Sequence, residues 1–354
     1  MKLNDFKIYI CQFCVVYRQE KSCLLSIKLF NKMSLKFILL ILSFPFIVSS
    51  QDAVGSGTCN YIESKTRRFT GYLCKLSANE SEVLTEIDGG HLEGKTDDDL
   101  TYVTGSNLTF MTLTSIFCEK FKNTERMSIF KSKVNKIDEN ALEKRKNLEL
   151  FDFCDTKVSV VPEKLFLHNS KLKVIKLNRN RITTLPENVF SNLKDLLNIF
   201  IYSNEISYLP PNIFKSNTKL RLLFLDNNKL TAINSNWFVN MPDLDRLNLA
   251  DNQILDLPQN AFINLKILPF IWLANNNLTV IHSDSFGVND KLEHLYLRNN
   301  KIIAIDEKFV INTAIQKIDM SGNVCSQEDI NNRFQIKEAF QKCFDNYRPR
   351  KEQT

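Results

Sequence analysis

The sequence has little excess of charge once its first residues are set aside. It carries 46 Lys and Arg against 40 Asp and Glu in 354 residues. Residues 1–50 hold seven of the basic and two of the acidic residues, which leaves 39 basic and 38 acidic residues in 51–354, a net charge of about +1. A nearly neutral chain gives no electrostatic reason to expect a nucleic-acid ligand.

Histidine is also scarce, with four copies in the whole chain. The repeat described below directs only His294 toward the expected ligand-facing surface, and it brings no Ser, Cys or Asp into a catalytic arrangement with that ring. The run Asp97–Asp99 lacks the spaced oxygen ligands of a calcium loop and is typical of a solvated turn. The sequence therefore predicts neither an enzyme nor a protein that depends on a metal or another cofactor.

Long apolar runs are rare, and the one present lies near the start, at Leu35–Val48. Fourteen residues that include a proline are too few to span a bilayer comfortably, so a membrane anchor is the weaker interpretation. Basic residues before the run and small residues after it are typical of a secretory signal peptide. We predict a signal peptide over 33–50, cleavage near Gln51 and no membrane anchor in the mature chain. Met33 is then the natural start, and 1–32 is a leader whose translation is doubtful.

Six of the nine cysteines follow this predicted signal, and an even number in a secreted chain predicts disulfides. Cys59 and Cys74 flank a predicted hairpin of two short strands, and we expect them to pair. Cys325 and Cys343 bracket a predicted helix and should form a second disulfide. The pair Cys11-x-x-Cys14 has no partner pair to complete a metal site, so we assign it no function.

The two remaining cysteines are placed differently by the repeat. Cys154 stands at a strand position, whereas Cys118 falls in a slot on the opposite side of the core, so a bond between them is geometrically doubtful. Cys154 is therefore free or links to another chain. Three glycosylation sequons begin at Asn79, Asn107 and Asn277, in keeping with passage through the secretory route.

The strongest signal is a repeat of 24 residues that closes on asparagine. Each copy reads L-x-x-L-x-L-x-x-N, as in LRLLFLDNN at 220–228. Alternate residues of a short strand point to one side, so the L-x-L positions predict a strand that buries leucines. An asparagine amide both donates and accepts, so it can satisfy buried backbone groups where the chain turns after the strand, whereas Asn227 should face outward. The predicted column is Asn180, Asn204, Asn228, Asn252, Asn276, Asn300 and, one residue early, Asn323.

Weaker copies of the repeat extend upstream. Leu148 and Met127 begin two of them, Thr156 and Ser132 replace the asparagine with a hydroxyl, and Leu100 begins a cap-like strand. In the returning half of each repeat one slot is filled by phenylalanine, which predicts a second spine in the convex half of the core. Its members are Phe166, Phe190, Phe214, Phe238, Phe262 and Phe286.

Stacked repeats leave an apolar core open at both ends, so the ends need covers. We assign 51–123 to an N-terminal cap and a degenerate first coil, 124–323 to the repeats, and 324–354 to a C-terminal cap and polar tail. Ser326 and Asp329 should begin a helix in that cap. The apolar residues expected on this helix are Ile330, Phe334, Ile336 and Phe340.

The outward-facing strand positions define the candidate ligand-binding surface, because a solenoid usually binds on its concave side. Repeats between about 196 and 298 place aromatic side chains there, whereas earlier repeats place Lys, Arg and Asp. Clustered aromatics favour an interface, although aromatics also pack on one another across strands, and Asn248 interrupts their column. The candidate residues are Phe200, Tyr202, Phe224, Phe270, Trp272, His294, Tyr296 and Arg298.

The repeats at 124–323 resemble the typical 24-residue class of extracellular leucine-rich repeats. The segments GYLC ending at Cys74 and GGHLEGKTDDDLTYV at 89–103 resemble secreted leucine-rich-repeat proteins of flies and mosquitoes. The resemblance implies an α/β solenoid, a horseshoe with a parallel concave sheet and disulfide-bearing caps. Two features depart from the relatives: the C-terminal cap has two cysteines rather than four, and no heptad run follows Asn323.

The sequence thus predicts a secreted, non-catalytic recognition protein. We expect its partner to be an extracellular protein or glycan, in innate immunity, adhesion or signalling. The alternative is a structural component of the extracellular matrix, linked to other chains through Cys154. Neither the identity of the ligand nor the oligomeric state follows from the residues.

Overall fold

The computed structural model describes residues 54–65, 70–78 and 81–350, apart from a few side chains that include Cys118. All of them belong to one compact unit, Asp52–Thr354. The predicted leader and signal peptide, Cys11-x-x-Cys14 and Asn79 lie outside the described residues. Among those residues, no helix is long and apolar enough to cross a membrane.

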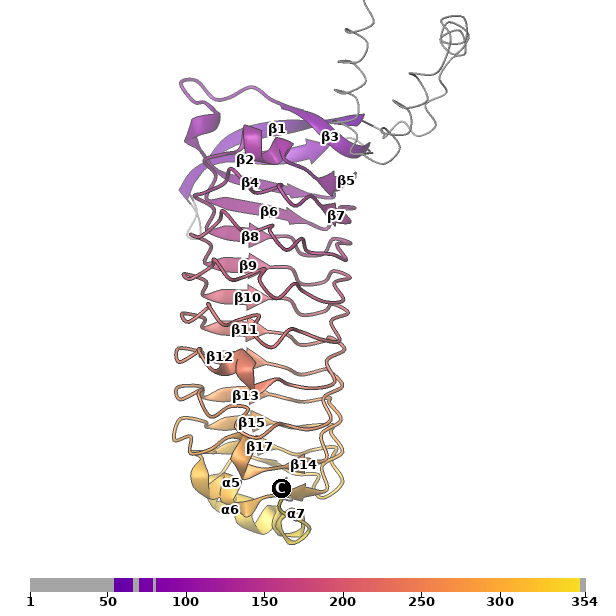
Figure 1. The fold of residues 1–354 in the computed structure, drawn as a ribbon, viewed down its shortest axis with the longest axis vertical. Coiled ribbons are helices and arrows are strands. Elements are labelled where there is room, and N and C mark those ends of the chain that lie inside the picture. The colour runs from indigo at the N-terminus through magenta and orange to yellow at the C-terminus, as the bar shows by residue number, and fades with distance from the viewer. Residues whose placement is uncertain (1–53, 66–69, 79–80, 351–354) are drawn as a thin grey trace, which may run out of the picture. The chain divides into compact units, whose positions relative to one another are not determined.

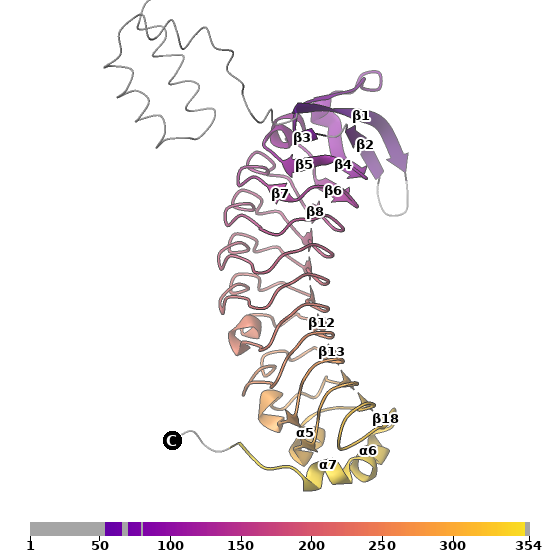
Figure 2. The same ribbon diagram turned by 90° about the vertical axis from the view of Figure 1, so that its right-hand side faces the viewer.

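The repeats fold into a parallel solenoid, as the sequence predicts (Figure 1). Each strand pairs in register with the strand one repeat later, so that Leu223 lies opposite Leu247 and Phe224 opposite Asn248. The strands line the concave side and irregular returning segments form the convex side (Figure 2). The repeat strands are β6 (Arg126–Phe130), β8 (Leu150–Asp152), β9 (Val174–Lys176), β10 (Asn198–Phe200), β11 (Leu222–Phe224), β12 (Arg246–Asn248), β13 (Phe270–Trp272), β15 (His294–Tyr296) and β17 (Lys317–Asp319).

Two apolar columns fill the core between these sides. In the repeat around β11, Leu220, Leu223 and Leu225 are completely buried. Across the core, neighbouring rings of the phenylalanine spine contact each other in most repeats; the rings of Phe190 and Phe214, for example, are 6.1 Å apart and nearly parallel. All six phenylalanines predicted for this spine are buried to 1% exposure or less, which confirms the second column.

The asparagine column supplies the hydrogen bonds that the turn after each strand needs. The side-chain amide of Asn228 donates to the carbonyls of Ile201 and Leu225, at 3.1 and 3.0 Å, and its oxygen accepts from the backbone N–H of Ile206 at 3.0 Å. The same three bonds recur at the next repeat, centred on Asn252. Each column side chain therefore links adjacent coils through buried backbone groups.

A second column that the sequence reasoning missed lies one residue earlier. Asn227 is exposed, as predicted, but its φ of 51° lies in the left-handed region that most side chains avoid. The equivalent residues in other repeats share this conformation, with φ between 48° and 57°. They are Lys131, Asp155, Arg179, Ser203, Asp251, Asn275 and Asn299, followed by Gly322 at φ 74°.

The N-terminal cap is a sheet that curls around the open end of the core. A long hairpin, rather than two short strands, is formed by β1 (Val54–Lys65) and β2 (Thr70–Ala78), and the Cys59–Cys74 disulfide joins them. From β2 the sheet continues into the concave strands through β4 (Leu100–Ser106). From β1 it continues along the other side through β3 (Ser81–Asp88), β5 (Phe110–Leu113) and β7 (Lys136–Ile137), with η1 (Asp97–Asp99) and α4 (Ile116–Lys120) between strands.

The C-terminal cap carries the predicted Cys325–Cys343 disulfide, but its helix begins later than predicted. Asp329 and Ile330 form β18 (Asp329–Ile330), antiparallel to β17, so they are unavailable to a helix. The helix α6 (Arg333–Ala339) is capped by Asn332 and is followed by α7 (Gln341–Asp345). Ser326 instead accepts from the N–H of Glu328 in a local turn.

The apolar face assigned to this helix is also partly wrong. Ile336 and Phe340 are fully buried, whereas Phe334 is 93% exposed, because the later helix start turns it away from the core. The remaining short elements lie on the returning side: η2 (Ser235–Phe238), β14 (Val280–Ile281), η3 (Ser283–Ser285), β16 (Ala304–Ile305) and α5 (Glu307–Asn312).

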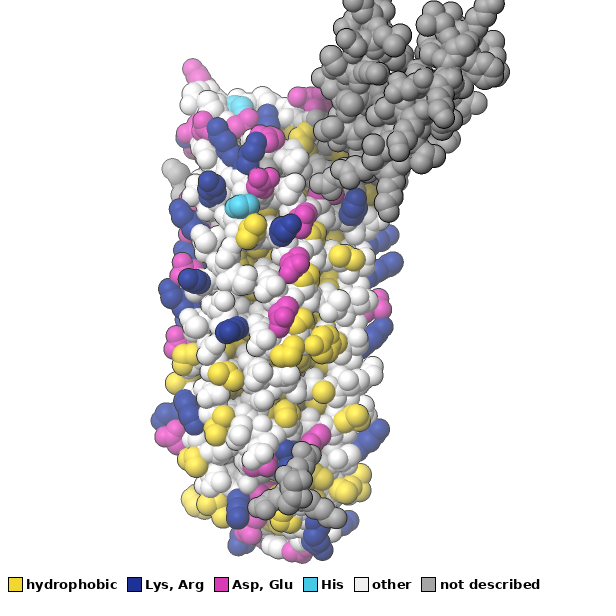
Figure 3. All heavy atoms as spheres, in the orientation of Figure 1, with side chains coloured by type: hydrophobic (Ala, Val, Ile, Leu, Met, Phe, Trp, Pro, Cys, Tyr) yellow, Lys and Arg dark blue, Asp and Glu magenta, His cyan; other side chains and the backbone are white. Residues whose placement is uncertain are grey.

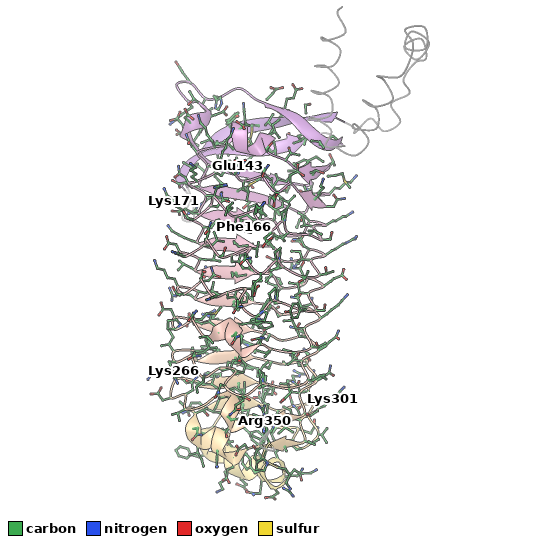
Figure 4. The ribbon with its side chains drawn as sticks, in the orientation of Figure 1. Glu143, Phe166, Lys171, Lys266, Lys301 and Arg350 are labelled. Atoms are coloured by element: carbon green, nitrogen blue, oxygen red, sulfur yellow. A yellow bond between two sulfur atoms is a disulfide. The ribbon has the colours of Figure 1, made fainter. Side chains whose placement is uncertain are left out.

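The segment after α7 folds back over the convex side. Asn346 donates to the carbonyl of Ile303, and the Tyr347 hydroxyl lies 3.2 Å from His282 Nδ1. Arg350, labelled in Figure 4, donates to the carbonyl of Leu257 and lies 3.4 Å from an Asp256 carboxylate oxygen. The tail therefore ties three successive coils together.

Candidate ligand-binding surface

The strand pattern sets which side chains face the concave side. In β11 the middle residue Leu223 is buried, and its neighbours Leu222 and Phe224 point the other way and stay partly exposed. Because the register is the same in every repeat, the first and last residues of each strand form two continuous columns across the sheet. All six ring-bearing residues predicted for these columns are half-buried there.

The rings fall into two groups rather than one continuous column. Phe200 and Phe224 form an edge-to-face pair with centroids 5.3 Å apart. Between this pair and the next group stands Asn248, whose side-chain oxygen accepts from the N–H of Ala250 at 3.1 Å. Beside it Arg246 is exposed, and no ion pair engages it among the described residues. The predicted interruption at Asn248 therefore divides the aromatic surface.

The second group, which we call the four-ring cluster, contains Phe270, Trp272, His294 and Tyr296. Phe270 and His294 stack with centroids 4.7 Å apart, and Trp272 and Tyr296 stack at 5.7 Å with planes 2° apart. The ammonium of Lys317 lies 5.6 Å from the Tyr296 ring centre. Such stacking contributes to stability, yet the cluster remains half-exposed on a surface where it could contact a partner.

The two other predicted residues lie beyond the strand ends. Tyr202 follows β10 and is half-buried, and Arg298 follows β15 and is exposed. Neither is part of a ring stack or ion pair in the described part of the chain. They mark the edge of the candidate surface rather than its centre.

The earlier repeats carry charges that neutralise one another on the same face. Lys173 lies 2.7 Å from Glu149, and Lys176 lies 3.1 Å from Asp152. Asp152 is only 9% exposed, so its carboxylate depends on the neighbouring ammonium. This half of the concave sheet is polar but internally paired.

One acidic residue on this face was missed by the sequence reasoning. Asp226 follows β11 on the same side as Phe224, and burial raises the pKa of its carboxyl to about 6, with a further contribution from Asp251. Its own backbone N–H opposes the rise. One carboxylate oxygen is shielded from solvent and has no hydrogen-bond partner. A carboxyl just after a repeat strand gives no such signal in the sequence, because its burial depends on how the neighbouring repeats pack.

Cys154 carries a free thiol that is half-buried after β8. Burial, followed by the nearby charge of Asp152, raises the pKa of the thiol to about 12. A protonated thiol is a poor nucleophile, so Cys154 is badly suited to forming a bond with another chain. The side chain of Cys118 is outside the described part of the structure.

The acidic run in the cap forms a structured turn. Thr96 and Asp99 cap η1 reciprocally, and Asp97 bonds to His91 and Lys120 at 3.1 and 3.2 Å. The described residues contain no group of three or more His, Cys, Asp or Glu that could hold a metal ion. The charges of this turn are engaged in fixing the cap.

The two described sequon asparagines lie on the same edge of the solenoid, after the ends of the strands. Asn107 is exposed and has a φ of 56°, in the left-handed column. Asn277 is half-buried and follows the column residue Asn276 by one position. Lys301, one repeat after Asn277, projects from the flank of the solenoid in Figure 4.

Comparison with known families is decisive for the fold. A family model described as leucine rich repeat matches residues 146–206, 195–254, 218–278, 244–302 and 271–324. Together the matches cover 146–324, just over half of the chain. The chain belongs to the leucine-rich-repeat family. No catalytic family is indicated, and no curated protein sequence matches this leucine-rich-repeat chain.

Solved structures show the same architecture at low identity. The leucine-rich repeat domain of APL1 is 19% identical, with a TM-score of 0.51 over 76% of this chain and 77% of that one. Toll, from a Drosophila Toll–Spatzle complex, is 21% identical with a TM-score of 0.54 over 69% of this chain. TLR13, from a TLR13–ssRNA13 complex, is 19% identical with a TM-score of 0.55 over 63%. The matched regions span 38% of Toll and 32% of TLR13, and such likeness shows the fold alone.

Proposed function

We propose that this leucine-rich-repeat protein is secreted and binds a macromolecular ligand, without catalysis, through the C-terminal half of its concave sheet. The observation that carries the proposal is the four-ring cluster, together with the Phe200–Phe224 pair. Aromatic side chains bury much area at little entropic cost, so Trp and Tyr dominate binding hot spots. A folded chain gains little from leaving so many rings half-exposed unless a partner covers them.

An extracellular location is supported by independent features. Both caps carry disulfides, which persist in oxidising compartments. The predicted signal peptide at 33–50 and the sequons at Asn107 and Asn277 agree with the same route. Figure 3 shows Lys, Arg, Asp and Glu side chains along both flanks and the middle of the convex face, with apolar side chains scattered among them.

For the ligand we propose an extracellular protein or glycan, in immunity, adhesion or signalling. Structural neighbours include Toll in complex with Spatzle, and a TLR13 complex with single-stranded RNA. The near-zero net charge of 51–354 argues against an RNA ligand, because nucleic-acid binding draws on excess positive charge. A matrix role through Cys154 is disfavoured by the raised pKa of its thiol.

Comparative affinity capture from extracellular fluid tests the proposal. The baits are the wild-type chain, the double variant Trp272→Ala/Tyr296→Ala, and the control Val174→Ala, which truncates a half-buried concave residue of the charged half. We expect the same species on the wild-type and control baits and its loss from the double variant. Equal retention by the folded double variant would contradict the proposed site, and retained RNA would contradict the ligand class.

A further inference from the structure

Ion pairs between neighbouring coils are a regular feature of this solenoid. Lys219 pairs with Asp195 and Lys229 pairs with Glu205, both at 2.7 Å and both across one repeat of 24 residues. Repeat-equivalent residues meet in this way because the coils stack in register, about 4.8 Å apart along the sheet. Repeat-equivalent residues of the same charge must instead repel each other.

One column on the flank of the solenoid departs from this pairing. Lys133, Lys157 and Arg181 are repeat-equivalent, positively charged and exposed. Their coils are in direct contact: the backbone N–H of Lys157 donates to the carbonyl of Val134 at 2.8 Å, and the equivalent bond joins the coils of Lys157 and Arg181 at 2.9 Å. Lys301 belongs to the same column further along the chain, and Figure 4 shows it projecting from the flank.

The left-handed column adds further positive charge beside these residues. Lys131 and Arg179 are exposed members of it, two positions before Lys133 and Arg181. Over these three coils the two columns hold a single carboxylate, that of Asp155, which lies 3.5 Å from Arg179. We call the cations of these two columns the basic stripe: Lys131, Lys133, Lys157, Arg179 and Arg181.

Neighbouring carboxylates leave the charge of the basic stripe largely uncompensated. In the part of the chain that the structure describes, no ion pair engages Lys157 or Arg181. Glu205, which follows Arg181 in the column, is hydrogen-bonded to Lys229; this bond is the main cause of its lowered pKa, and Arg181 contributes least. A chain that is otherwise nearly neutral over 51–354 therefore concentrates positive charge on one flank.

We propose that the basic stripe binds an anionic polysaccharide that bears sulfate groups, along the flank of the solenoid. This is a second site, separate from the aromatic part of the concave sheet. The charges of a linear polyanion recur along one direction, as the cations of the stripe do across successive coils. Sulfate oxygens accept the charge-assisted hydrogen bonds that ammonium and guanidinium groups donate.

The surroundings of the stripe favour a polysaccharide over a nucleic acid. The next outward positions on the same three coils hold Asn135, Ser159 and Thr183, all of them exposed. Their amide and hydroxyl groups can exchange hydrogen bonds with sugar hydroxyls. Proteins that bind single-stranded nucleic acids add aromatic rings on which the bases stack. None of these three columns holds an aromatic residue over the coils of the stripe.

Calorimetric titration of the full-length chain with a heparin oligosaccharide tests the proposal. Lys157→Gln/Arg181→Gln should weaken binding about tenfold, because two cations that face the polyanion are lost. The dependence of log affinity on log salt should become shallower by about two. The control Lys171→Gln/Lys219→Gln removes the same net charge from exposed lysines of one repeat-equivalent column, and it should leave the affinity unchanged. Lys171 lies on the flank opposite Lys301 in Figure 4.

Four results would overturn the assignment. Heparin that does not bind at physiological salt would refute the site, and an equal loss of affinity in the control would show that net charge alone governs binding. Equal affinity for desulfated heparin would remove the role of sulfate. Tighter binding of an oligonucleotide of the same charge would assign the stripe to a nucleic acid.

The same titration separates the stripe from the concave surface. Trp272→Ala/Tyr296→Ala should bind heparin as the wild type does, because the four-ring cluster lies outside the stripe. Loss of heparin binding in that variant, with full binding in Lys157→Gln/Arg181→Gln, would place the polysaccharide on the concave sheet and refute the flank site. Failure of the stripe would leave the proposed function of the four-ring cluster intact.

Discussion

The two halves of the concave sheet share one backbone and differ in their side chains. Strands β8 and β9 present Asp152 and Lys176, which pair at 3.1 Å, whereas β13 and β15 present Trp272 and Tyr296, which stack at 5.7 Å. Both halves bury the same core columns, although Thr156 replaces the column asparagine in the repeat of β8. The buried columns therefore specify the solenoid. The outward-facing columns can vary without changing the fold, and they determine what the surface can bind.

The largest expected difference in the free energy of unfolding is between alanine variants of a core phenylalanine and of a surface phenylalanine. Phe214 is 1% exposed in the spine, and Phe224, ten residues later, is half-exposed on the concave face. Phe214→Ala should lower the free energy of unfolding by about 3–5 kcal/mol, because it leaves a cavity. Phe224→Ala should lower it by about 1 kcal/mol. Denaturant unfolding of both variants checks this, and equal losses would refute the division between core and surface.

The next largest difference in the free energy of unfolding is expected between variants of the adjacent residues Asn227 and Asn228. Asn228→Ala removes three hydrogen bonds to buried backbone groups and should cost about 1–3 kcal/mol of unfolding free energy. At Asn227 glycine is the proper substitution, since alanine would be strained at a φ of 51°. Asn227→Gly should cost a few tenths of a kcal/mol by comparison. Similar shifts in the denaturation midpoint for both variants would show that the assigned register is wrong.

A pH-dependent effect is expected at the boundary between the two halves. The pKa of Asp226 is raised to about 6 in the folded chain, so the folded state holds its proton more tightly than the unfolded state does. Stability from this group is therefore present in acid and is lost as the pH rises from about 4 to about 6. Asp226→Asn should raise the melting temperature at pH 7.5 by about 2 °C and lose that advantage near pH 4. A constant difference across this range would contradict the raised pKa.

The smallest expected change in the free energy of unfolding is in the charged half of the concave sheet, at Lys176. Lys176→Ala should lower the free energy of unfolding by about 1 kcal/mol or less, because Asp152 loses its ammonium partner. Arg246→Ala, in the aromatic half, should change it by still less, since Arg246 is exposed and forms no described ion pair. Thermal melts at low and high salt compare the two, and only the Lys176 effect should diminish with salt.

Much of the fold could be predicted because its residues repeat. The register of the strands, the Asn228 column and the phenylalanine spine follow from alternation and spacing alone, and the disulfides follow from the cysteines at each end. The C-terminal helix was predicted too early because Ser326 and Asp329 match a capping pattern, whereas the chain uses Asp329 in a strand against β17. The repeat does not extend into this segment, so no spacing of equivalent residues could distinguish a helix from a strand.

The candidate surface was only partly accessible from sequence. The columns that hold Trp272 and Tyr296 could be predicted, since a fixed register directs them outward. The left-handed column could have been recognised from its many Asn and Asp residues, which tolerate positive φ. The unpaired oxygen of Asp226 could not, because its burial depends on the packing of neighbouring repeats.

The most direct test of the central claim measures stability and affinity on the same two variants, Trp272→Ala and Tyr296→Ala. If the four-ring cluster is a binding surface, each should weaken binding of the captured ligand by about 2 kcal/mol or more while lowering the free energy of unfolding by about 1 kcal/mol or less. Calorimetric titration and denaturant unfolding provide both values. Unchanged affinity together with a large loss of stability would show that the rings pack the sheet and do not bind the ligand.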